Sequence, residues 1–144
     1  MENNKLNIKN MKEVRDSELV RVTGGVHNSS GSGMAEWALH AVGWNYVYGG
    51  ATSGGVDGPG LIYAYAGGAR TTEAMYAVSP RKGSIDTLSE TPGLGLYMPG
   101  NVGVYVGNGM CVYAANEAEG VVMQSIHGMP WTAWFEIYGI NYAM

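Results

Sequence analysis

The stretch NVGVYVGNGMCVYAAN, residues 101–116, decides the fold of the second half of this chain. Small or polar residues alternate with apolar ones on both sides of a Gly-Asn-Gly turn, which is the pattern of a β-hairpin. Two further extended stretches follow, GVVMQSI at residues 120–126 and WFEIYGINYA at residues 134–143. We therefore predict an antiparallel sheet in the C-terminal half of the chain.

Upstream of the hairpin the apolar residues recur at helical spacing. MAEWALHAV, residues 34–42, places its large apolar side chains on one side of a helix. A second helix is predicted from residue 58 to about residue 66, with Pro59 in its first turn and two glycines at its end. A third short helix covers residues 71–79. Helices followed by strands indicate an α+β fold in which N-terminal helices pack on an antiparallel sheet.

The composition restricts the classes of function. The chain has 144 residues, of which 46% are hydrophobic and 14% are charged, and this is typical of one globular domain. The formal net charge of −4 gives no basic footprint for nucleic acid, and no apolar run is long enough to span a membrane. The single Cys excludes an internal disulfide. The three His residues lack metal-ligand spacing, so neither a metal nor another cofactor is predicted.

The first 25 residues differ from the rest. Four apolar residues fall on one face of a predicted helix that ends at Gly24 and Gly25, namely Met11, Val14, Leu19 and Val22. This spacing, with Glu18 beside Leu19, resembles the double-glycine leader of exported bacterial peptides and bacteriocins. The resemblance implies cleavage after Gly25 by the peptidase domain of an export transporter, and secretion. The alternative is an amphipathic N-terminal helix with a glycine stop.

The resulting division is a leader at 1–25, a flexible linker at 26–33 and one domain at 34–144. Four stretches in that domain resemble the NlpC-type family of bacterial cell-wall cysteine peptidases, which have a papain-like fold. They are WNYVYGG (44–50), GGVDGPGLIY (54–63), TPGLGLYMPGNVGVYVGNG (91–109) and PWTAWFEIYGINY (130–142). The resemblance implies a Cys at a helix start, a His at the start of the hairpin and a third polar residue on its return strand. The family's usual substrate is a peptide bond in the stem peptides of peptidoglycan.

This chain departs from the family at each catalytic position. Gly58 stands at the Cys position, Asn101 at the His position and Tyr113 at the third position. Glycine offers no nucleophile and asparagine takes no proton at physiological pH, so the pattern predicts an inactive relative. The remaining thiol, Cys111, shares a strand face with Tyr113 and would need His127 as its base. The alternative reading is a half-buried structural cysteine.

Three residues near these positions match the aromatic and acidic residues that line the cleft in this family. Tyr46, Tyr48 and Asp57 are candidate cleft-binding residues, and Asp57 either accepts a hydrogen bond from a ligand or caps the second helix. The first functional hypothesis is an exported, inactive relative that binds peptidoglycan peptide or a protein partner. The second is an active cell-wall peptide hydrolase, or a lytic bacteriocin-like toxin, with non-standard catalytic residues. The third is an exported remnant or signalling protein without a binding cleft.

Overall fold

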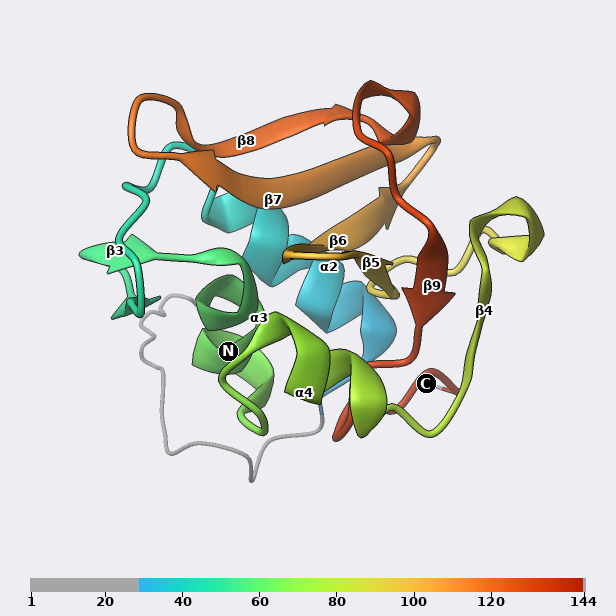
Figure 1. Cartoon of the computed structure of the whole chain (residues 1–144). Coiled ribbons are helices and arrows are strands. Elements are labelled where there is room, and N and C mark those ends of the chain that lie inside the picture. Colours follow the sequence, from blue (N-terminus) through green and yellow to red (C-terminus); the bar gives the residue numbers. More distant parts are fainter. Residues whose placement is uncertain (1–28, 144) are drawn as a thin grey trace, which may run out of the picture.

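A computed structural model describes residues 29–143 (Figure 1). The expected leader, with Glu18, Leu19, Val22, Gly24 and Gly25, lies outside the described residues. The helices in order are α2 (Gly31–His40), α3 (Gly58–Ala66) and α4 (Thr72–Ala77). The strands are β2 (Ala51–Thr52), β3 (Gly55–Val56), β4 (Lys82–Ser84), β5 (Gly95–Met98), β6 (Asn101–Gly107), β7 (Met110–Asn116), β8 (Gly120–Ser125) and β9 (Ala133–Phe135). Two short 3-10 helices are also present. Ile85–Thr87 follows β4, and Ile126–Gly128 lies between β8 and β9.

The hairpin predicted from the sequence is confirmed as β6 and β7 at the centre of a sheet. The strand order is β4-β9-β5-β6-β7-β8, and every neighbouring pair is antiparallel. Asn108 at the hairpin turn has a φ of 56°, between two glycines that also have positive φ. This left-handed turn explains the Gly-Asn-Gly sequence, because other side chains rarely adopt that conformation. Its register places Gly103 opposite Tyr113.

The sheet separates two apolar clusters. All three helices lie on one side of it, as Figure 1 shows, and Met34, Leu61 and Met75 from those helices pack against Val104 and Val112 of the hairpin. The alternate hairpin residues point to the other side of the sheet. There Tyr105, Cys111 and Tyr113 form a smaller cluster together with Leu94, Leu96 and Trp131. The α+β architecture is therefore confirmed, with the strand period of two deciding which side each residue buries.

The first helix begins earlier than predicted. Its N-cap is Ser30, whose hydroxyl accepts a hydrogen bond from the Gly33 backbone N–H at 3.0 Å. Gly31 lies so close to Pro92 and Tyr142 that a Cβ there would stand 2.6 Å from the Pro92 carbonyl oxygen. The last residues of the expected linker are thus part of the domain. A run of small residues predicts flexibility, but it also permits the close packing that is seen here.

Two other differences concern the strands. The extended stretch expected at residues 134–143 is a strand only over Ala133–Phe135, after which the chain turns back toward the first helix. The strands β4 and β5 were not predicted. They are short, and their glycines weaken the alternating pattern on which a strand prediction depends. No helix in the described part of the chain is long and apolar enough to cross a membrane.

Candidate functional site

The N-terminus of α3 is built around the Asp57 carboxylate. One oxygen, Oδ1, accepts a hydrogen bond from the Gly60 backbone N–H at 2.8 Å, which is the N-cap contact. The other, Oδ2, accepts one from the Gly49 backbone N–H at 2.8 Å. Asp57 is only 9% exposed, so both oxygens serve the protein's own backbone. The helix-cap interpretation of Asp57 is confirmed, and the carboxylate also ties the turn at Gly49 to the helix.

Gly58 and Asn101 lie against each other, although 43 positions in the sequence separate them. A Cβ atom added to Gly58 would overlap Asn101 Oδ1. The Asn101 side chain is held in that place, because Oδ1 accepts from the Val102 backbone N–H at 2.8 Å and Nδ2 donates to the Ala114 carbonyl at 3.3 Å. The space that a side chain at position 58 would need is therefore filled by an amide whose oxygen and nitrogen each make a hydrogen bond to the backbone.

Tyr113 turns away from this point. Its ring packs edge-on against Trp131, with ring centroids 5.6 Å apart, and its hydroxyl accepts a hydrogen bond from Gln124 Nε2. Burial raises the pKa of the Tyr113 phenol. Among the residues of β7, it is Ala115, two positions further along the strand, that lines the cavity beside Gly58 and Asn101. Of the three positions predicted from the family resemblance, the structure thus brings Gly58 and Asn101 together and places the Tyr113 side chain in the smaller cluster.

A groove remains open beside Gly58. Its volume is about 490 Å³, and Tyr46, Tyr48 and Asp57 all contribute to its wall, together with Pro59, Thr71, Thr72, Gly100 and Asn101. Tyr48 is 87% exposed, which is the largest exposure among the large hydrophobic side chains of the described residues. The three residues predicted for the cleft wall therefore line one groove, with one aromatic ring free to meet a ligand.

No known family's sequence profile matches the chain, and no curated protein matches it in sequence. Solved structures do match in three dimensions. The NlpC/p60 domain of the peptidoglycan hydrolase SagA aligns with a TM-score of 0.60 at 19% identity, over 75% of this chain and 99% of that one. The peptidoglycan hydrolase RipB of Mycobacterium tuberculosis aligns with a TM-score of 0.59 at 22% identity, over 93% and 79%.

A third match is the P60 domain of the antigen MAP1204 from M. avium subspecies paratuberculosis, with a TM-score of 0.56 and 25% identity over 78% of this chain and 98% of that one. The chain has the papain-like NlpC/p60 fold. The alignments cover 75% to 93% of this chain, so the likeness extends over most of the chain rather than over one shared motif. The fold class inferred from the four sequence stretches is confirmed.

Cys111 does not reach the groove of this NlpC/p60 fold. Its side chain is fully buried in the smaller cluster, and burial raises the pKa of its thiol. A raised pKa disfavours the thiolate, which is the reactive form. His127 lies in the exposed 3-10 helix Ile126–Gly128, and no hydrogen bond joins it to Cys111 in the part of the chain that the structure describes. The geometry favours the structural interpretation of this cysteine.

Sequence reasoning missed Arg70, which also lines the groove. Its guanidinium donates to the Gly49 carbonyl at 2.8 Å and stands 4.5 Å from the centre of the Tyr63 ring. A signal existed, since only Arg70, Arg81 and Lys82 are basic after residue 25, and a rare charge next to a predicted helix is informative. Among residues 29–143 no cluster of His, Cys, Asp and Glu side chains is arranged to hold a metal ion.

Proposed function

We propose that this chain is an exported, catalytically inactive protein of the NlpC/p60 fold, and that it binds a peptidoglycan stem peptide in the groove beside Gly58. The observation that carries the proposal is the Gly58–Asn101 contact. Cys–His catalysis needs a nucleophile at the helix start and a base beside it. Here the first position has no side chain and the second has an amide, and that amide occupies the space of the missing nucleophile.

The groove keeps features that suit a peptide. Tyr48 offers an exposed ring, and the Arg70 guanidinium uses one N–H on Gly49, which leaves further donors for a ligand carboxylate. Stem peptides carry free carboxylates and short aliphatic side chains, and both fit a groove with one cation and two tyrosines. A protein partner that presents an extended acidic segment would use the same contacts, and it is the alternative ligand.

The export part of the proposal rests on residues 1–25. Their resemblance to a double-glycine leader implies a transporter with a peptidase domain as the processing partner, and release of residues 26–144 into the cell wall or medium. Mass spectrometry of the secreted product would test this, because cleavage after Gly25 predicts the mass of residues 26–144. Substitution of Gly24 and Gly25 by Ala should block processing, since added Cβ atoms hinder entry to a narrow peptidase cleft.

Binding would be measured by calorimetry with a purified stem tripeptide and the chain spanning residues 26–144. Loss of the exposed ring in Tyr48→Ala should weaken binding about tenfold, the effect of losing roughly 1.4 kcal/mol. Arg70→Ala should weaken binding of the tripeptide more than binding of the same peptide with amidated carboxyls. Tyr138→Ala is the matched control, because Tyr138 is 62% exposed and does not line the groove. Equal affinity in all four proteins would refute the proposed site.

Turnover is the second measurement. Incubation with labelled muropeptides should give no new fragments by mass spectrometry. Fragments that persist through purification and vanish in Cys111→Ala or His127→Ala would establish the active hydrolase instead. The buried Cys111 thiol argues against that outcome, because attack on a peptide bond requires the sulfur to reach the substrate.

A further inference from the structure

A second cavity in the described part of the chain is larger than the groove beside Gly58. It has a volume of about 820 Å³ and lies at the other end of the molecule, between β4, β9 and the C-terminal segment, on the right in Figure 1. It shares no lining residue with the groove. We call it the β9 pocket and define it by Arg81, Thr87, Thr91, Trp134, Glu136 and Tyr142.

One wall of the β9 pocket is the indole of Trp134. Three atoms of this ring would lie 2.8 to 2.9 Å from a Cβ placed on Gly83, so the ring packs directly against Gly83, in space that a side chain there would need. The ring is also fixed in rotation, because Nε1 donates to Thr87 Oγ1 at 2.8 Å and that hydroxyl donates to the Ser84 carbonyl at 2.7 Å. A half-buried indole held in this way is a rigid flat platform.

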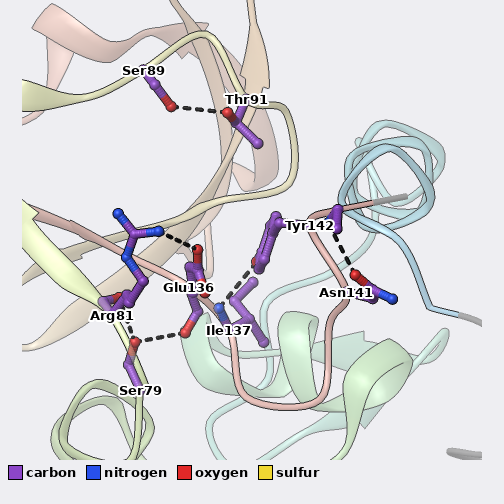
Figure 2. A network of polar contacts seen from close by, with 9 residues as sticks. Ser79, Arg81, Ser89, Thr91, Glu136, Ile137, Asn141 and Tyr142 are labelled. Carbon is purple, nitrogen blue, oxygen red and sulfur yellow. Dashed lines mark hydrogen bonds and ion pairs between the residues drawn. The ribbon is translucent and has the colours of Figure 1, made fainter.

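The other walls supply polar groups that are incompletely used. The Arg81 guanidinium and the Glu136 carboxylate stand 3.8 Å apart, which is too long for a hydrogen bond. Ser89 donates to Thr91 at 2.9 Å, so Thr91 retains its own O–H proton and Ser89 retains its acceptor lone pairs. Figure 2 shows these groups around one space, with Tyr142 and Asn141 across from Ser89 and Thr91.

The pocket is built before any ligand arrives. The Tyr142 hydroxyl accepts from the Ile137 backbone N–H at 3.0 Å and donates to the Gly93 carbonyl at 2.9 Å, as Figure 2 shows in part. Burial raises the pKa of this phenol, which therefore stays a neutral donor. Tyr142 thus joins the C-terminal segment to the start of β5 and holds one wall in place.

We propose that the β9 pocket binds a neutral oligosaccharide. A pyranose ring has a C–H face that stacks on a flat aromatic ring, and hydroxyls that both donate and accept. The Trp134 platform meets the first requirement. The gap between Arg81 and Glu136 meets the second, because one ligand hydroxyl accepts from the guanidinium while its neighbour donates to the carboxylate. One positive and one negative side chain line the pocket, so its charges do not favour an anion or a cation.

The test uses the full chain of 144 residues and two neutral probes, chitotetraose and cellotetraose, which differ in their N-acetyl groups. Binding is followed by calorimetry and by saturation-transfer NMR, which reports the ligand protons that contact the protein. We expect millimolar or tighter binding of at least one probe, with the strongest transfer to the C–H face of one sugar ring. Trp134→Ala should weaken this binding at least about tenfold.

Further variants keep the test decisive if Trp134→Ala fails to fold. Arg81→Gln and Thr91→Val alter exposed or partly exposed groups, and each should weaken sugar binding about three- to tenfold. Tyr48→Ala, at the opposite end of the molecule, should leave it unchanged. Absence of binding by both probes would overturn the proposal, as would loss of binding in Tyr48→Ala with retention in the pocket variants. Either result leaves the peptide proposal for the groove intact, because the two cavities share no residue.

Discussion

The groove beside Gly58 and the β9 pocket use polar side chains in opposite ways. In the groove, Asp57 and Asn101 give their hydrogen-bonding atoms to the backbone around them. In the pocket, Arg81 and Glu136 stand close without a hydrogen bond, and Arg81 is 73% exposed. Arg70 is the side chain of the groove that keeps free donors, whereas in the pocket both charged side chains keep atoms that make no hydrogen bond among the described residues. A polar side chain that is hydrogen-bonded to the backbone stabilises the fold. An exposed polar side chain without such a bond remains available for a ligand.

This difference predicts that substitutions at the groove lower the stability of the protein strongly, whereas substitutions at the pocket hardly change it. The largest effect is expected for Asp57→Ala, which removes the cap of α3 and leaves the Gly49 N–H without its acceptor. Together these losses should lower the free energy of unfolding by about 3 kcal/mol. Urea unfolding measures it, with the exposed Asp86→Ala as the control, expected within about 0.5 kcal/mol of the parent. A similar small loss for both would remove Asp57 from its structural role.

The second prediction concerns the filled space at position 58. Gly58→Cys should destabilise the protein by about 1 to 3 kcal/mol, because the new side chain overlaps Asn101 Oδ1. The cost of this substitution should fall by about 1 kcal/mol or more in an Asn101→Ala background. Gly54→Cys is the matched control, since its Cβ would meet only Thr52 Oγ1, at 3.5 Å.

The cysteine introduced by Gly58→Cys should not give hydrolysis, because no imidazole lies beside it in the described groove. A double-variant cycle with no coupling between positions 58 and 101 would contradict the filled-space account. Muropeptide cleavage by Gly58→Cys alone would show that the groove retains more catalytic machinery than its lining residues offer.

The smallest effect is expected in the pocket. Arg81→Ala removes a long ion pair at the surface, and such pairs contribute about 0 to 1 kcal/mol. The free energy of unfolding should therefore change by less than about 0.5 kcal/mol, while oligosaccharide binding weakens. A stability loss as large as that of Asp57→Ala would erase the contrast between the two cavities, and would make Arg81 a structural residue.

Much of the fold was predictable from local signals. The second helix begins and ends as its Asp-Gly-Pro start and its glycine stop predict, and the turn of the central hairpin lies at the Gly-Asn-Gly sequence. These features depend on neighbours in the chain, so a single sequence contains them. The three cleft residues Tyr46, Tyr48 and Asp57 were assigned through the family resemblance, and the shared fold places them in one groove.

Other features depend on contacts that no local pattern encodes. The strand alternation puts Cys111 and Tyr113 on one face, as expected, but the sheet places that face against Trp131 rather than in the groove. The start of α2 at Gly31 depends on Pro92 and Tyr142, which are far away in sequence. Arg70 enters the groove because its guanidinium reaches the Gly49 carbonyl across a turn.

The amino-acid sequence by itself determined the α+β layout, the caps of its helices, the register signal of its hairpin and the lack of a nucleophile at the start of α3. Those properties follow from side-chain types and their spacing along one stretch of chain. Only the tertiary structure decided that Asn101 fills the space beside Gly58 and that Cys111 is fully buried. It also decided that a second cavity opens beside Trp134. Each of these depends on which surfaces meet when the sheet and helices pack, and packing joins residues that the sequence keeps apart.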